Sequence, residues 1–192
     1  MKTVLLFFLI IGCSASFSQN GFQKQSIQVL PESQLTITGD TNINTFLCNF
    51  NTAPILHNKN LRYTVNKAEI SFENAKLRLE DQGFDCGNKS INRDFQKLIQ
   101  SDKYPEIILE IKKIYFETSN HAKAEVIISI AGKHKKYKIP VEIINSPTPR
   151  YKGNLQLNIN DFELTPPKKI FGLIEVKEDI EINFNLIVEN TI

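Results

Sequence analysis

Three cysteines are the first residues of this sequence whose type and spacing could do chemistry. Cys13 follows an N-terminal apolar run, whereas Cys48 and Cys86 are 38 residues apart in the remainder of the chain. These two thiols fall short of the four nitrogen or sulfur ligands that a structural zinc ion takes. In an oxidising compartment we expect them to form a disulfide, which would stabilise the fold by about 4 kcal/mol on the chain-entropy model. The alternative is a pair of buried free thiols.

The histidines do not suggest catalysis or metal binding. His57, His121 and His134 stand in polar segments without the spacing of metal ligands, and we expect them at the surface. The sequence also lacks a glycine-rich phosphate loop, a nucleophile-elbow serine and the HExxH pattern. It therefore predicts no catalytic residue, no metal site and no cofactor, and the chain is not expected to be an enzyme.

Two groups of charged residues remain. Asp81, Asp85 and Asp94 could pair in space for acid–base chemistry, but isolated carboxylates of this kind are common in any sequence. The segment 133–138 holds four lysines beside a histidine and could form a basic patch for anionic lipid headgroups. We favour the other interpretation, a solvated hairpin tip whose lysines protect a sheet edge.

The composition is that of an ordinary globular protein. The chain has 192 residues, 41% of them hydrophobic, and 23 basic side chains against 21 acidic ones. A net charge of +2 gives no sign of the basic face that a nucleic-acid-binding protein needs. The length suits one domain of medium size.

The N-terminus predicts export. Lys2 precedes the unbroken apolar run 4–11, which is too short to span a bilayer as a helix but is typical of a secretory signal peptide. Small residues at 16 and 18 indicate cleavage near Gln19, giving a signal peptide over 1–19, a single domain over 20–192 and a periplasmic or secreted location. The alternative is a lipobox ending at Cys13, which would make an envelope lipoprotein anchored there. No later stretch is apolar enough to predict a membrane span.

The rest of the chain is dominated by alternation of apolar and polar residues, the pattern of strands with one buried face. The clearest case is the run from Ile180 to Val188, and a turn at 131–134 separates two further strands. Successive strands with short connections predict a meander that closes into a barrel or a sandwich. The predicted strands include 35–37, 68–72, 77–79, 107–111, 124–130, 137–143, 155–159 and 180–188.

One segment shows helical spacing instead. Apolar residues at 91, 95, 98 and 99 form one stripe and predict a helix over 91–100. Asn92 or Ser90 could cap its start. Pro105 prevents the helix from continuing into the next strand.

Four pieces of the sequence, in this order, resemble the YceI-like family of exported isoprenoid-binding proteins. They are the strand pair over 33–46, Asn92-Arg93-Asp94 followed by Asp102-Lys103-Tyr104-Pro105, the hairpin 128–141, and the closing positions Asp161-Phe162, Pro166-Pro167, Gly172 and Asp179. The resemblance covers 25–190. The chain departs from the family's pattern at the lysine-rich turn 133–136 and at Glu163, where the family usually has glycine.

The resemblance implies an all-β protein with one short helix, folded as an eight-stranded antiparallel lipocalin-like barrel. Such a barrel would hold a long-chain isoprenoid or similar lipid-like ligand, and the resemblance leaves a homodimer open. Cavity walls and plain cores have the same sequence signature, so the alternative is a side-chain-filled barrel serving as a structural or protein-interaction module. The expected wall residues are Phe46, Phe95, Leu109, Ile111, Ile128, Val141, Leu157, Phe171 and Phe184.

Overall fold

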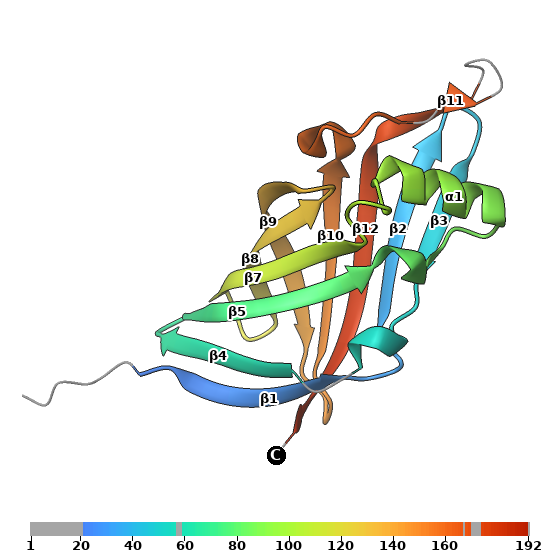
Figure 1. Cartoon of the computed structure of the whole chain (residues 1–192). Coiled ribbons are helices and arrows are strands. Elements are labelled where there is room, and N and C mark those ends of the chain that lie inside the picture. The colour runs from blue at the N-terminus through green and yellow to red at the C-terminus, as the bar shows by residue number, and fades with distance from the viewer. Residues whose placement is uncertain (1–20, 57–58, 167, 170–173, 192) are drawn as a thin grey trace, which may run out of the picture.

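The computed structural model describes residues 21–56, 59–166, 168–169 and 174–191 (Figure 1). The expected signal peptide and Cys13 lie outside these residues. The described part is built mostly of strands, with one α-helix, α1 (Lys89–Leu98), and three short 3-10 helices, η1 (Ala53–Ile55), η2 (Asp81–Gly83) and η3 (Ile159–Phe162). The strands are β1 (Gln23–Val29), β2 (Gln34–Thr41), β3 (Thr45–Phe50), β4 (Lys59–Asn66), β5 (Glu69–Glu80), β6 (Phe84–Asp85), β7 (Glu106–Phe116), β8 (His121–Ile130), β9 (Lys133–Ile144), β10 (Arg150–Asn158), β11 (Lys168–Lys169) and β12 (Ile174–Thr191).

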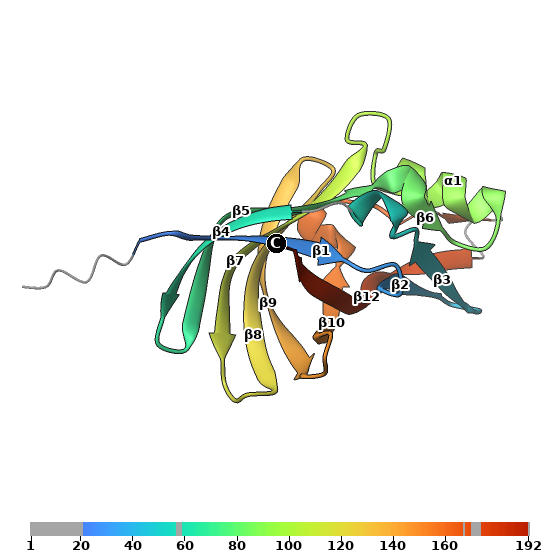
Figure 2. The same cartoon turned by 90° about the horizontal axis from the view of Figure 1, so that it is seen from below.

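Eight of the strands form a closed antiparallel ring in the order β1-β4-β5-β7-β8-β9-β10-β12, and β12 pairs with β1 to complete it. Figure 2 shows these strands curving around one another in turn. Closure leaves no free edge around the ring. The predicted eight-stranded antiparallel barrel with one helix is therefore confirmed.

The long strand β12 belongs to two parts of the sheet at once. Near its C-terminus Val188 pairs with Val29 of β1, whereas Phe184, earlier in the strand, pairs with Leu35 of β2. Strands β2, β3 and β6 therefore continue the sheet outside the ring. Helix α1 lies beside this extension in both views (Figures 1 and 2).

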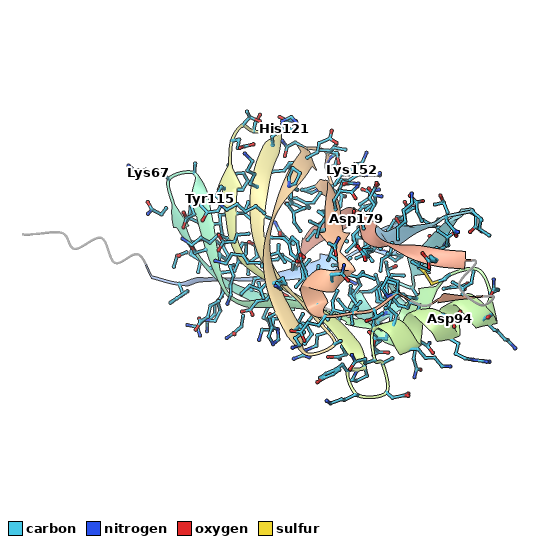
Figure 3. The ribbon with its side chains drawn as sticks, turned by 90° about the horizontal axis from the view of Figure 1, so that it is seen from above. Lys67, Asp94, Tyr115, His121, Lys152 and Asp179 are labelled. Atoms are coloured by element: carbon cyan, nitrogen blue, oxygen red, sulfur yellow. A yellow bond between two sulfur atoms is a disulfide. The ribbon has the colours of Figure 1, made fainter. Side chains whose placement is uncertain are left out.

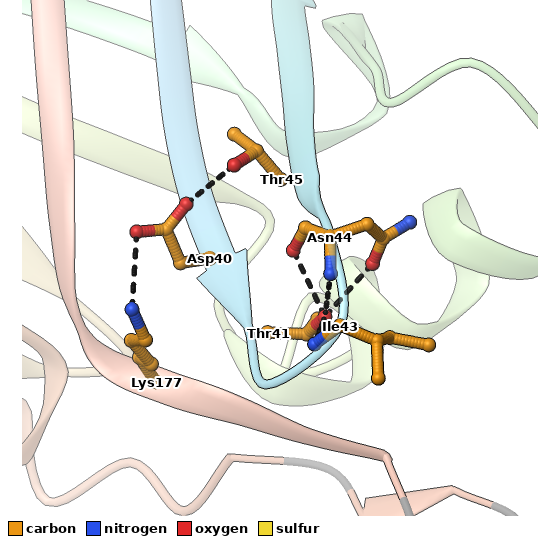
Figure 4. Close-up of polar contacts among 6 residues, drawn as sticks. All are labelled: Asp40, Thr41, Ile43, Asn44, Thr45 and Lys177. Carbon is orange, nitrogen blue, oxygen red and sulfur yellow. Dashed lines mark hydrogen bonds and ion pairs between the residues drawn. The ribbon is translucent and has the colours of Figure 1, made fainter.

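The turn between β2 and β3 is fixed by side chains of its own segment (Figure 4). The Thr41 hydroxyl accepts hydrogen bonds from the backbone N–H groups of Ile43 (3.1 Å) and Asn44 (2.9 Å). The Thr45 hydroxyl donates to Asp40 (2.7 Å), and this bond, helped by nearby Lys177 of β12, holds the pKa of Asp40 below its usual value. The strand pair that the resemblance predicted at this place is present.

The predicted hairpin between β8 and β9 has a two-residue turn, since Ile130 pairs with Lys133. Ala131 and Gly132 both have positive φ, 48° and 76°. Two positive values are the signature of the turn whose twist matches a hairpin. Lys133 and Lys136 form ion pairs with Glu163 (2.6 Å) and Glu125 (3.0 Å), in keeping with a solvated hairpin.

The predicted helix is present, but it starts two residues earlier than predicted. Helix α1 begins at Lys89, and its N-cap is Asn88, whose side chain accepts hydrogen bonds from the N–H groups of Ser90 and Ile91. The predicted caps Asn92 and Ser90 were wrong. Asn92 instead accepts a hydrogen bond from the Cys86 N–H (2.7 Å), so it fixes the segment that leads into the helix.

The disulfide prediction is confirmed. Cys48 of β3 is bonded to Cys86, which lies between β6 and α1, and both residues are buried. The bond ties the outer part of the sheet extension to the segment that starts the helix. Phe50 and Phe84 pack beside it, with ring centroids 4.9 Å apart.

Candidate functional site

The inner face of the barrel is identified by strand register, because residues paired directly across two strands point to the same face. Ile114 of β7 pairs with buried Ala124 of β8, and on its other side with Ile70 of β5. Tyr151 of β10 pairs with buried Ile143 of β9. Ile70, Ile114 and Tyr151 are thus inward-facing.

At one end of the ring these inward side chains are apolar, yet they stay partly accessible to solvent. Neighbouring members are linked by register: Tyr63 pairs with Phe72, and Tyr151 pairs with Leu186. These residues keep accessible surface, so this end of the barrel is not sealed by packing. We call the set the inner wall; it comprises Leu61, Tyr63, Ile70, Phe72, Ile114, Tyr151, Leu186 and Val188.

The opposite end of the barrel is packed solid. Ile128 of β8 and Leu157 of β10 are each 1% exposed, and Phe162 of η3 is buried beside them. The Phe162 ring stacks on Tyr137 at 6.4 Å, and the Tyr137 hydroxyl donates to Asp161 (3.0 Å). The barrel therefore has one closed end and one end with an accessible apolar lining.

The rim of the accessible end is also apolar. Val65 of β4 and Phe116 of β7 are inward-facing, but they are 43% and 37% exposed. Lys67, Tyr115 and His121 lie at this end, far from Asp94 of α1 (Figure 3). Exposed inward-facing apolar residues at a barrel mouth suit an apolar ligand better than an ion or a sugar.

Few polar atoms interrupt the inner wall. The Tyr63 hydroxyl donates to Gln25 on β1 (3.3 Å). Burial raises the pKa of Tyr151, so its phenol is neutral at physiological pH and can serve as a hydrogen-bond donor. Such a wall can bind a long hydrocarbon and can hydrogen-bond one polar group at its surface.

Eight of the nine predicted wall residues are in the described part of the chain, and they fall into three groups. Leu109, Ile111, Val141 and Phe184 are inward-facing members of the ring with some accessible surface. Ile128 and Leu157 belong to the closed end, where packing leaves them almost no surface for a ligand. Phe46 and Phe95 lie outside the ring: Phe46 is on β3 and Phe95 is on α1, its ring 5.1 Å from Phe84. Phe171 lies outside the described residues.

The sequence analysis missed the inner wall on β4. Leu61, Tyr63 and Val65 alternate with Arg62 and Thr64, which is a period-two pattern. That alternation was the available signal.

The described histidines and Asp85 lie away from the inner wall. His121 and His134 are exposed, and His134 is 2.6 Å from the Ser129 hydroxyl on the outer hairpin surface; His57 lies outside the described residues. Asp85 accepts hydrogen bonds from the Asn92 side-chain amide and the Gly87 N–H, and these bonds lower its pKa. The described residues also contain no group of three or more histidines, cysteines or carboxylates placed to hold a metal ion.

Asp81 differs from Asp85 in that it is buried and its pKa is raised. It is 1% exposed in η2, beyond the end of β5, and burial raises its pKa to about 6. The Ser101 hydroxyl and the Ile107 N–H oppose this rise, while the charge of Glu106 adds to it. Because Asp81 lies away from the inner wall, its unusual pKa concerns stability rather than ligand chemistry.

Comparison with solved structures supports the barrel. The chain is similar to BcnA of Burkholderia cenocepacia (TM-score 0.62, 19% identity, covering 82% of this chain and 96% of that one). It is also similar to a polyisoprenoid-binding domain from Saccharophagus degradans implicated in plant cell wall breakdown (0.57, 10%, 87% and 99%). A third similar structure is the YceI protein of Campylobacter jejuni (0.53, 17%, 69% and 80%).

These identities are low, so the likeness establishes a shared fold. No protein-family model matches the sequence, and neither does any curated protein. Within the described residues, no helix is long and apolar enough to cross a membrane.

Proposed function

We propose that this chain is a YceI-like binding protein that carries a polyisoprenoid or another long apolar molecule inside its barrel. The observation that carries the proposal is the contrast between the two ends of the ring. One end is packed solid around Ile128 and Leu157, whereas the inner wall at the other end is apolar and accessible.

The energetics favour a long hydrocarbon. Transfer of one CH₂ group from water to an apolar surface gains about 0.8 kcal/mol. A ligand with about twenty buried carbons would gain on the order of 15 kcal/mol, from which the costs of association are subtracted. The shared fold with a polyisoprenoid-binding domain supports the same ligand class.

We further propose that the protein works outside the cytoplasm. The buried Cys48–Cys86 disulfide supports this location, because cytosolic thiols are kept reduced. The apolar run 4–11 supports export by a signal peptide. The mass of the intact mature protein would distinguish cleavage near Gln19 from lipidation at Cys13.

The experiment is mass spectrometry of an organic extract of the protein purified from its native envelope fraction. A long-chain isoprenoid or lipid at stoichiometric amount, absent from a matched control protein, is the expected result. An empty extract from correctly folded protein would contradict the carrier function and would favour a side-chain-filled interaction module.

A pair of variants on β4 locates the ligand. Leu61→Asn places an amide on the inner wall and should release the ligand, because its polar group would be desolvated against hydrocarbon. Thr64→Asn adds the same group on the outer face of the same strand and should leave the ligand bound. Equal ligand content in both variants would mean that the molecule binds elsewhere.

A further inference from the structure

A groove of about 480 Å³ runs across the outer face of the sheet, on the side away from the inner wall. Register places the polar part of its lining on that face: Thr36 pairs with Asn183, and Asn183 pairs with Asn154. Gln34 and Asn185 form the next such pair. Lys152 and His121, at its far side, are on the same face, since both pair with Glu142 of β9; both are labelled in Figure 3. The lining also includes four residues at inward-facing positions, Ala122, Val141, Gly153 and Phe184.

The groove follows from the way β12 is shared. The outer face of a closed barrel is ordinarily convex, but here β2 and β3 leave the ring and the sheet changes direction at β12. A second hollow of about 230 Å³ shares Gln34 and Thr36 with the groove and reaches Asn49 of β3. From β8 to β3 the two hollows cross five strand spacings, roughly 24 Å. That length suits an extended ligand.

Five of the fourteen residues that line the groove carry a carboxamide or a hydroxyl, namely Gln34, Thr36, Asn154, Asn183 and Asn185. A carboxamide both donates and accepts hydrogen bonds. These side chains are held in place before any ligand arrives. Asn154 donates to Asn183 (2.7 Å) and to Glu181 (2.6 Å), and Asn183 also donates to Glu181 (2.6 Å). These bonds, with one from Gln156, lower the pKa of Glu181, so it remains a charged acceptor that orients both amides.

One acceptor in the groove has no partner. The Oδ1 atom of Asn185 is shielded from solvent and accepts no hydrogen bond from any described residue. Leaving a shielded acceptor unpaired costs about 1–3 kcal/mol, so a rotation of the Asn185 side chain that exposes this atom to a ligand's donor would be favourable. The formally charged residues of the lining are Lys152, Glu117 and Glu142, which leaves one negative charge in excess. This small excess disfavours an anionic ligand and leaves a neutral one acceptable.

We propose that this groove is a second binding site, for a neutral oligosaccharide. Sugar hydroxyls donate and accept hydrogen bonds at once, as the carboxamides require. An extended peptide is the competing occupant, but peptides are usually held by a free strand edge, and the groove lies on the face of fully paired strands. The site is on the opposite face from the inner wall and does not depend on the proposed carrier function.

The test is an NMR titration of ¹⁵N-labelled protein with cellohexaose, maltohexaose and chitohexaose. At least one of these hexasaccharides should shift the side-chain amide signals of Asn154, Asn183 and Asn185 to saturation. Asn183→Leu should weaken that binding about tenfold or more, because it removes a bond worth about 1.4 kcal/mol or more.

Thr36 and Thr38 provide a matched comparison, since both face outward on β2 with similar exposure but only Thr36 lines the groove. Thr36→Val should weaken binding, and Thr38→Val should leave it unchanged. Melting temperatures of all variants would verify that each is folded. The proposal is overturned if no hexasaccharide binds to saturation, if binding is unaffected by Asn183→Leu, or if only a glycine-serine hexapeptide binds.

Discussion

The ring of Phe184 lies directly against the backbone of Gly153 on the neighbouring strand. A Cβ at position 153 would overlap the ring, coming within 2.6 Å of Cε1, and would lie 2.9 Å from the Pro140 carbonyl oxygen. The absence of a side chain at Gly153 therefore allows the aromatic ring to occupy this place. This contact joins β9, β10 and β12 where the inner wall meets the outer groove.

Gly153→Ala should lower the free energy of unfolding by about 1–3 kcal/mol, as overpacking of a filled site does. Urea denaturation measures the loss. The double variant with Phe184→Leu should recover part of it, because the smaller side chain leaves room for the new methyl group. An equal loss in the presence and absence of Phe184→Leu would assign the clash to the Pro140 backbone alone.

Asp81→Asn should stabilise the protein at neutral pH. The pKa of Asp81 is raised from 3.8 to about 6 in the folded state, so folding disfavours its charged form. The free energy of unfolding is therefore unaffected by this group below pH 4, where the carboxyl is protonated in both states, and it decreases as the pH rises from 4 to 6. Above pH 6 the decrease reaches about 3 kcal/mol, the amount that corresponds to this pKa shift.

The measurement is the difference in unfolding free energy between wild type and Asp81→Asn at pH 4 and at pH 8. The variant should have a higher free energy of unfolding than wild type at pH 8 and nearly the same value at pH 4. Asp85→Asn is the control, and its effect should have the opposite sign. Hydrogen bonds lower the pKa of Asp85, so removing this carboxylate should decrease the free energy of unfolding at neutral pH. A gain for Asp81→Asn that is equal at both pH values would contradict the charge argument.

Replacing both disulfide cysteines by alanine should lower the free energy of unfolding by roughly 4 kcal/mol, because a loop of 38 residues is released in the unfolded chain. Comparison of urea midpoints for Cys48→Ala/Cys86→Ala and wild type gives the value. Reductant should change the wild-type midpoint and leave the variant unaffected. No difference between the two proteins would mean that packing around Phe50 and Phe84 holds this region without the bond.

Local patterns predicted most of the barrel. Alternation along the segment from Ile180 to Val188 follows from one buried face, and the turn at Ala131-Gly132 follows from its need for positive φ. The N-cap of α1 was predicted wrongly because several polar residues near the start of the helix could act as its N-cap, and tertiary contacts decide among them. Asn88 caps the helix, and Asn92 is already used by the backbone of Cys86.

The candidate site was less predictable for a physical reason. Ile111 and Ile128 have the same chemistry and the same inward direction, but Ile128 lies at the filled end and Ile111 nearer the accessible one. Periodicity reports which face a residue occupies and gives no position along the barrel axis. The outer groove escaped prediction because it depends on β12 pairing with both β1 and β2, a non-local relationship.

Glu163 occupies the position where the sequence resemblance expects glycine, and its backbone explains the expectation. It follows η3 with a φ of 57°, in the left-handed region that costs residues with a side chain roughly 1–2 kcal/mol. Glu163→Gly should therefore raise the melting temperature, with a net gain of up to about 1 kcal/mol after the greater entropy of glycine in the unfolded chain is subtracted.

The substitution also removes the ion pair with Lys133, but those side chains are 46% and 70% exposed, so the pair contributes little. Glu163→Ala separates the two effects: it loses the ion pair but keeps the left-handed strain, so it should not stabilise. Thermal unfolding of both variants measures the difference. If Glu163→Gly and Glu163→Ala melt together, the backbone at this position is not strained and the family's glycine has another cause.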